Sequence, residues 1–366
     1  MARSDKDNPA KEQALKFCVS SGVMTFLEVD VYNVVELTSA PKKITDIDVL
    51  GISLRQDGSI ARTVYDCKCS GGPAFARALW LSGLMQYTGI DDGLILMGKS
   101  AERAHRLAAR KLNVNVFGSN AFDNYAAATS VEYKLLKSHA GNIENWHRAY
   151  DGALNQPAIQ SILAIIQQEV PLSNDPARSI RRLISRTLPF KGELNPNKPL
   201  HMFAFVEFVT SISLLLNMIV ADIRNIVDLS EGEGDFLKVV RYYLWGGPEG
   251  VANLKRMYEI LKTHDSTTEQ ETALIAWPQF VQLVRGLLES PTHVRNAVIA
   301  LRELSLRQVA DVDDGADMRL GRLFAAPRAR QFAKRLGGYS ASALRLPSEF
   351  ADRMDVQIDQ LVAKVG

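Results

Sequence analysis

A predicted β-hairpin between Ile44 and Ser70 constrains the fold of this 366-residue chain more than any other segment. Its strands are rich in apolar residues, and the Asp-Gly pair in the intervening "RQDGS" is a strong signal for a tight turn. Four charged residues interrupt the apolar pattern, namely Asp46, Asp48, Asp66 and Lys68. Acidic residues are poor strand formers, and burying them costs free energy unless a partner offsets that cost. These carboxylates therefore need a partner in the folded protein.

The register of the hairpin depends on the length of its loop. A three-residue loop from Gln56 to Gly58, with Gly58 in a left-handed conformation, would place Asp48 directly opposite Asp66. The Cβ atoms of such a pair lie about 4.5–5.5 Å apart. Because side chains alternate along a strand, Lys68 would share the face of Asp66. A two-residue loop would instead point the two carboxylates to opposite faces. We predict the three-residue loop.

Facing carboxylates repel and raise each other's pKa unless a cation lies between them. Mg²⁺ or Mn²⁺ takes carboxylate oxygens and keeps several waters, and the Cys67 carbonyl could supply a further oxygen ligand. Lys68 would orient or help deprotonate an attacking water and neutralise charge on a phosphate. The hairpin therefore predicts a metal site suited to phosphodiester hydrolysis. The alternative is a solvated face with ordinary cross-strand ion pairs.

The surrounding segments predict an α/β N-terminal domain. Residues 10–22 have helical spacing and residues 23–37 read as a long strand. After the hairpin we expect a helix over 73–89, then the strand "GLILMG", the helix "AERAHRLAARKL" and the strand "NVNVFG". An antiparallel start followed by crossover helices implies a mixed central sheet flanked by helices.

After about Asn120 the strand signals end, and the pattern is helical to the C-terminus. We therefore expect two domains, an α/β domain over 1–125 and an all-α region over 126–366. The main break should fall between 119 and 130. A division of the helical region into two subdomains would fall near 192–200 or 230–250.

The hairpin resembles the core of the PD-(D/E)xK nuclease superfamily. "DIDVLGI" is followed by "YDCK", and Asp66 comes 18 positions after Asp48. The order helix, three strands, helix, strand also matches, and the segment from "FARALW" to "NVNVFG" is similar to restriction-endonuclease-like domains related to the Mrr type. The resemblance covers roughly residues 10 to 120. It implies a restriction-endonuclease-like fold in which Asp48 and Asp66 bind metal and Lys68 is the catalytic lysine.

The resemblance implies further ligands as well. Members of the superfamily often carry a glutamate on the first helix, for which Glu12 is the candidate here, and Asp46 is an alternative ligand near Asp48. The chain departs from the family pattern at two positions. Ile47 replaces the proline, and Asp66 stands where glutamate or glutamine is more common.

Basic residues that could contact nucleic acid lie in two places. Arg77 is on the helix after the lysine strand, near the site by the fold analogy. The segment "MRLGRLFAAPRARQFAKRLGGYSASALR" contains no acidic residue, and its candidates are Arg322, Arg328, Arg330, Lys334 and Arg335. A local cationic segment in a chain of net charge +2 suits phosphate-backbone binding. The alternative is that these are ordinary exposed helical residues.

The sequence thus predicts a metal-dependent endonuclease, with DNA favoured because most of the resembled family cuts DNA. We further expect a role in restriction or antiphage defence, a homodimer, and a protein partner bound through the helical region. The alternative is a non-catalytic nucleic-acid- or partner-binding protein on a nuclease scaffold. Neither a P-loop nor a G-x-S-x-G or H-E-x-x-H motif occurs.

The apolar segment Met202 to Ala221 is about as long as a membrane span. It contains Glu207, lacks a clear basic flank and lies among amphipathic helices, so we expect a buried central helix. A membrane-associated sensor is the alternative. Three cysteines and a polar N-terminus without a signal peptide predict a reducing, cytoplasmic location and no membrane partner.

Overall fold

The computed structural model describes residues 5–33, 42–69, 73–227, 232–261 and 274–365. Its five described strands form one sheet in the order β1 (Met24–Asn33), β2 (Lys42–Leu54), β3 (Ile60–Lys68), β4 (Asp92–Met97) and β5 (Val114–Gly118). β2 runs antiparallel to β1 and β3, whereas β3, β4 and β5 are parallel. The predicted mixed sheet is therefore confirmed. Residues 34–37 of the predicted first strand lie outside the described residues.

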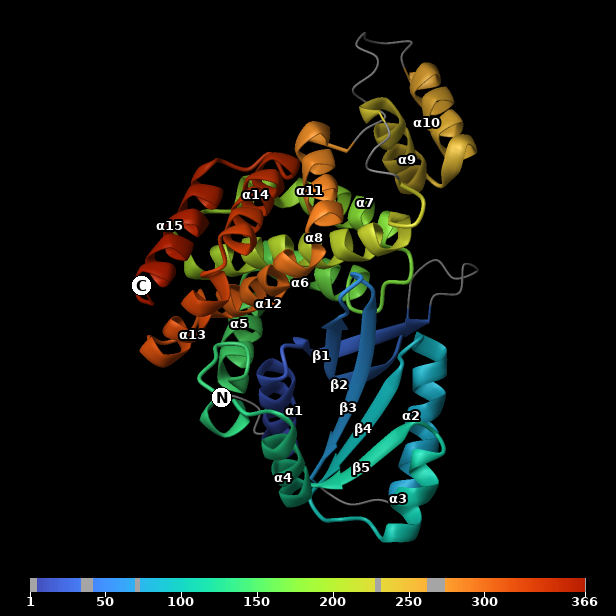
Figure 1. The fold of residues 1–366 in the computed structure, drawn as a ribbon, viewed down its shortest axis with the longest axis vertical. Helices are drawn as coiled ribbons and strands as arrows, with labels where there is room; N and C mark the ends of the chain where they lie inside the picture. The colour runs from blue at the N-terminus through green and yellow to red at the C-terminus, as the bar shows by residue number, and fades with distance from the viewer. Residues whose placement is uncertain (1–4, 34–41, 70–72, 228–231, 262–273, 366) are drawn as a thin grey trace.

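Helices flank this sheet, as Figure 1 shows. α1 (Asn8–Ser20) packs on β1, β2 and β3, while α2 (Ala74–Thr88) and α3 (Arg103–Arg110) pack towards β4 and β5. α4 (Ser119–Thr129) follows the last strand and packs on it. α2 ends where predicted because Gly89 adopts φ +69°, a left-handed conformation that glycine tolerates and that closes the helix.

The hairpin has the predicted three-residue loop. The Arg55 N–H donates to the Ser59 carbonyl over 2.8 Å, and the Gly58 N–H donates to the Arg55 carbonyl over 3.1 Å. Gly58 has φ +89°, which requires glycine or strains any other residue. The ladder pairs Val49 with Tyr65. The same register continued by one residue sets Asp48 opposite Asp66, as predicted.

The described chain after β5 is helical, which confirms the predicted change from an α/β domain to an all-α region. Its elements are η1 (Tyr133–Leu135), α5 (Ile143–Leu154), α6 (Pro157–Glu169), α7 (Pro176–Thr187), η2 (Leu188–Glu193), α8 (Pro199–Ile223), α9 (Glu233–Trp245), α10 (Gly247–Leu261), α11 (Trp277–Glu289), α12 (Pro291–Arg307), α13 (Asp314–Phe324), α14 (Pro327–Ala343) and α15 (Glu349–Ala363).

α8 is the central helix of this region. Among the described residues it is the one helix long and apolar enough to cross a membrane, yet its most apolar stretch is entirely buried inside the protein. α6, α7, α11, α12 and α14 pack around it. Its one acidic residue in the first half, Glu207, is bound by Arg302 of α12 and by the Ser305 hydroxyl. The expectation of a buried central helix is confirmed.

The sheet and the helical region share one hydrophobic core. The Arg302 guanidinium lies 4.6 Å from the ring centre of Phe26 in β1 and 5.3 Å from that of Trp146 in α5. On β3 the buried Arg62 donates to the Pro171 carbonyl over 2.9 Å. The predicted boundary at 125–126 falls inside α4. α6 and α12 of the helical region also pack directly on β1.

Candidate active site

Three carboxylates lie in a row across β1, β2 and β3. The β1–β2 ladder pairs Leu27 with Val49 and Val29 with Ile47, so Glu28 is opposite Asp48. Asp48 is in turn opposite Asp66. Glu28 has φ +54°, a left-handed conformation that is rare for a residue with a long side chain in a strand. Such conformations persist where surrounding contacts hold them, and they are frequent at functional sites.

Asp48 and Lys68 form the centre of the site. Asp48 Oδ2 accepts a hydrogen bond from the Cys67 N–H over 2.8 Å and lies 3.3 Å from Lys68 Nζ. Burial raises the pKa of Asp48. The Cys67 N–H and Lys68 counteract that rise, and the nearby Asp66 adds to it. The structure thus brings Asp48, Asp66 and Lys68 together on one face, as the sequence predicted.

Asp66 is held by an arginine. Its side chain is 5% exposed, and the Arg77 guanidinium of α2 donates to both carboxylate oxygens. The same guanidinium lies 5.3 Å from the ring centre of Trp80. Arg77 is therefore at the site, as expected from the fold analogy, but its partner is the Asp66 carboxylate. A phosphate contact by Arg77 would require it to leave Asp66.

The N-terminal segment contributes residues that the sequence analysis missed. Asp7, just before α1, accepts from the Cys69 N–H over 2.7 Å and lies 3.4 Å from Lys68 Nζ. Lys11 is buried, and its Nζ lies 2.7 Å from both Asp5 and Glu28 and 3.8 Å from Asp48. Burial acts to lower the pKa of Lys11, but the Asp5 and Glu28 carboxylates outweigh it and raise the pKa.

The remaining predicted ligands lie at the edge of the site or away from it. Glu12 pairs with Lys16 over 2.8 Å, away from the carboxylate row. Asp46 is exposed and lies 3.6 Å from Lys43. Cys67 uses its N–H for Asp48. Since the N–H and C=O of one strand residue point to the same side, the Cys67 carbonyl also faces β2.

The donor chemistry of the row fits a hard divalent ion. Asp48 and Asp66 offer adjacent carboxylate oxygens, the ligands that Mg²⁺ and Mn²⁺ prefer. Within the described ranges, however, no three His, Cys, Asp or Glu side chains already form a metal-binding group. Lys11 and Lys68 contact Asp48, and Arg77 occupies both oxygens of Asp66. A metal ion would therefore have to compete with Arg77 for Asp66.

The basic C-terminal segment does not meet this site. Arg322 is on α13, which packs on α12, α14 and α15, and the other four candidates are on α14, which packs on α8 and α12. In Figure 1 α14 is at the upper end of the view, whereas β3, β4 and β5 end at the lower end. Arg322 and Arg335 are exposed and Arg330 is half-buried. Arg328 donates to the Ser290 hydroxyl over 2.8 Å, and Lys334 pairs with Asp359 over 2.7 Å. These residues could contact nucleic acid only at a distance from Asp48.

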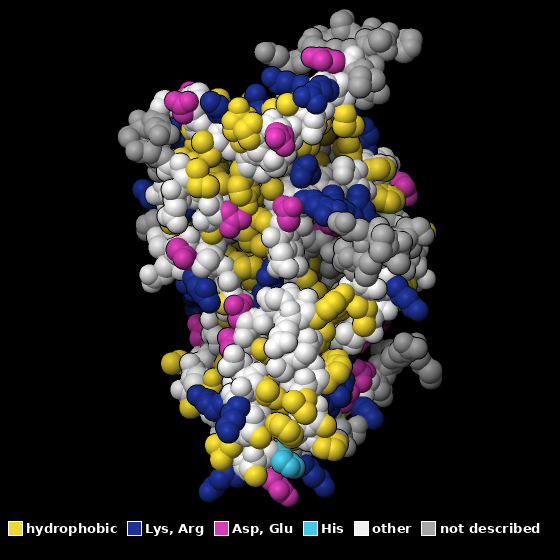
Figure 2. Space-filling model, turned by 90° about the vertical axis from the view of Figure 1, so that its right-hand side faces the viewer, with side chains coloured by type: hydrophobic (Ala, Val, Ile, Leu, Met, Phe, Trp, Pro, Cys, Tyr) yellow, Lys and Arg dark blue, Asp and Glu magenta, His cyan; other side chains and the backbone are white. Residues whose placement is uncertain are grey.

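A different surface lies beside the carboxylate row. Figure 2 shows hydrophobic side chains gathered on the face formed by α2 and α3, with lysines and arginines at its edges. Leu79, Trp80 and Leu107 are 51%, 44% and 62% exposed. Exposed arginines of α3, including Arg103 and Arg106, belong to the same face.

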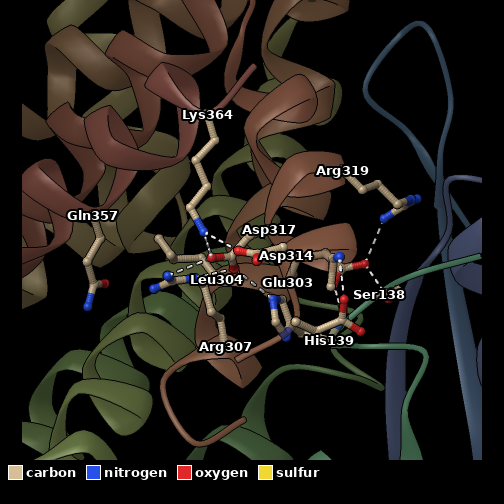
Figure 3. A network of polar contacts seen from close by, with 12 residues as sticks. Ser138, His139, Glu303, Leu304, Arg307, Asp314, Asp317, Arg319, Gln357 and Lys364 are labelled. Atoms are coloured by element: carbon tan, nitrogen blue, oxygen red, sulfur yellow. Dashed lines mark hydrogen bonds and ion pairs between the residues drawn. The ribbon is translucent and has the colours of Figure 1, made fainter. Parts of the chain in front are cut away.

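A second polar cluster, drawn in Figure 3, is a structural network. Asp317 is buried and accepts from Arg307, Lys364 and the His139 ring. Glu303 likewise accepts from the His139 N–H over 2.7 Å and from Arg319 over 2.8 Å. Each carboxylate is satisfied by several donors, so this cluster offers no vacant ligand.

Comparisons with family models, with curated proteins and with solved structures find no match to this chain.

Proposed function

We propose that the chain is a divalent-metal-dependent endonuclease that hydrolyses phosphodiester bonds, with DNA as the favoured substrate. The observation that carries the proposal is the meeting of Asp48, Asp66 and Lys68 on one face of adjacent strands, with Lys68 Nζ 3.3 Å from Asp48 Oδ2. The element order α1–β1–β2–β3–α2–β4 supports it, because this is the order that the resemblance to PD-(D/E)xK nucleases implies.

Asp48 and Asp66 would hold the metal ion. Bound there, Mg²⁺ or Mn²⁺ would polarise the phosphate and lower the pKa of a coordinated water. Burial acts to lower the pKa of Lys68, but Asp48, Asp66 and Asp7 outweigh it and raise the pKa. Lys68 is therefore a cation near neutral pH. It would donate hydrogen bonds to a phosphate oxygen and stabilise the developing charge, rather than remove a proton from water.

The nucleic acid would run over the face formed by α2 and α3. Trp80 offers an exposed ring for stacking on a base, and the α3 arginines offer phosphate contacts. Arg77, once released from Asp66, would contact a phosphate of the same nucleic-acid strand. This path is closer to Asp48 than the α14 residues are.

Plasmid cleavage in Mg²⁺ or Mn²⁺ tests the proposal. Lys68→Ala should lower the cleavage rate by about 10²–10⁴-fold, the usual contribution of a positioned acid–base or charged group. Lys16→Ala, which removes a half-buried lysine of α1 that pairs with Glu12, is the matched control and should cleave as wild type does. In calorimetry, Asp48→Ala should lose metal binding. Cleavage by Lys68→Ala at the wild-type rate, or unchanged metal binding by Asp48→Ala, would refute the assignment.

A non-catalytic binding protein on the same scaffold is the second candidate. It is favoured by one observation, the Arg77 guanidinium that occupies both oxygens of Asp66. Such a protein would bind DNA without cutting it. Replacing Arg77 would not increase its affinity for metal. A role in restriction or antiphage defence is a further proposal that rests on fold analogy. A homodimer, a partner of the helical region and a cytoplasmic location are also proposed, the last from the few cysteines and the polar N-terminus. Sedimentation with and without DNA tests the homodimer.

A further inference from the structure

A separate cavity is lined by residues of β1 and of the helices α5 and α6. These elements lie where the helical region meets the sheet (Figure 1). The cavity has a volume of about 350 Å³, within the range of small-molecule sites. Apolar side chains, among them Leu27, Leu154 and Leu163, form much of its wall. The cavity adjoins the carboxylate row through Glu28, whose side chain lines it and also binds Lys11.

The charged lining of the cavity is mostly acidic. Glu28, Asp30 and Asp151 supply three carboxylates, and His147 is the one basic side chain among the described lining residues. Glu28 is paired with Lys11 and Asp30 with Lys43. Asp151 is exposed and makes no ion pair within the described part of the chain. A ligand cation would therefore find Asp151 uncompensated.

Two aromatic rings in the wall of the cavity suit the same ligand chemistry. Tyr32 and Tyr150 both line the cavity, and such rings attract cations. Gln167 donates through its amide nitrogen to the Tyr150 hydroxyl over 2.6 Å and so holds that ring in place.

We propose that this cavity binds a small organic amine with an apolar or aromatic body. The amine would bind Asp151, while the body would lie against the leucines. The Asp151 carboxylate, which has no ion pair among the described residues, disfavours phosphate-bearing ligands by repulsion. Binding at this site does not depend on the proposed nuclease function, and it is measured without any activity assay.

Calorimetry on the full chain at low salt provides the test. The probes are tryptamine, phenethylamine and agmatine, and indole-3-propionate is the control that replaces the amine of tryptamine with a carboxylate. We expect saturable binding of at least one amine and none of the carboxylate. Failure of all three amines to bind saturably, or equal binding of indole-3-propionate, would overturn the proposal.

Two variants assign the binding to this cavity. Asp151→Asn should weaken amine binding about fivefold, as expected for a partly exposed ion pair. Asp352→Asn, an exposed aspartate on α15, makes the same chemical change elsewhere and should leave the affinity unchanged. Ala164 is an exposed residue of the cavity wall, so Ala164→Trp should block the mouth of the cavity and abolish binding, whereas Ala164→Ser should retain it. Unchanged affinity in both Asp151→Asn and Ala164→Trp would show that the amine binds elsewhere.

Discussion

Replacement of Arg77 by methionine should move two measurable quantities in opposite directions. The Asp66 side chain is 5% exposed and Arg77 is 31% exposed, and the guanidinium binds both oxygens of Asp66. Removal of one partner from a buried ion pair costs about 3–5 kcal/mol. Because Arg77 is partly exposed, we expect the lower end, about 3 kcal/mol, in the free energy of unfolding without metal.

The same change should strengthen metal binding. In the wild type, Mn²⁺ must displace Arg77 to reach Asp66, whereas in Arg77→Met the carboxylate has no competitor. If the full 3 kcal/mol is recovered, the dissociation constant for Mn²⁺ falls by about 100-fold. Calorimetry gives the affinity, and urea unfolding with and without Mn²⁺ gives the stability.

A matched control and a refuting result complete the experiment. Arg106→Met removes an exposed arginine of α3 and should change neither quantity. If Arg77→Met is destabilised but binds Mn²⁺ no better than wild type, Asp66 is not a metal ligand. The Arg77–Asp66 pair would then be a structural contact, and the non-catalytic reading of the scaffold would be preferred.

Three further predictions concern the fold. Arg302→Met leaves the 1%-exposed Glu207 without its cation and should lower the free energy of unfolding by about 3–5 kcal/mol in urea, with part of the loss recovered when Glu207→Gln is added. Asp317 has a pKa lowered by Arg307, Lys364 and His139 despite its burial, so its contribution is complete above the unfolded pKa of about 3.9 and is lost as the pH falls below it. Asp317→Asn should therefore be less stable than wild type by about 3 kcal/mol at pH 7, and the difference should narrow by pH 3; a constant difference would contradict the reasoning. Gly58→Ala forces a side chain into φ +89° and should cost about 1–2 kcal/mol, whereas Gly83→Ala, in α2 with open space around it, should stabilise by about 0.5–1 kcal/mol.

Local signals were sufficient for the hairpin and the nearby helices. The Asp-Gly turn and the apolar alternation set the register that places Asp48 opposite Asp66, and Gly89 marks the end of α2. These features depend on residues close together in the chain. The chemistry of the turn and the period of the strand therefore predict them.

The partners of the carboxylates could not be predicted in the same way. Lys11 reaches Glu28 only because α1 packs on the sheet, and Arg77 reaches Asp66 only through the packing of α2. One signal was present, since Asp7 and Lys11 are four positions apart and share one side of the first turn of α1. Glu12 was chosen by family analogy, and it lies on a different side of the same helix.

The charges of the cluster around Asp48 do not balance among the described residues, which is consistent with the proposed divalent ion. Among the residues that the structure describes, five carboxylates meet there, from Asp5, Asp7, Glu28, Asp48 and Asp66, and they share three cations, Lys11, Lys68 and Arg77. Five negative charges against three positive ones leave a net charge of −2. An excess of two negative charges in a partly buried site raises the free energy of the folded protein, and a single Mg²⁺ or Mn²⁺ would neutralise it.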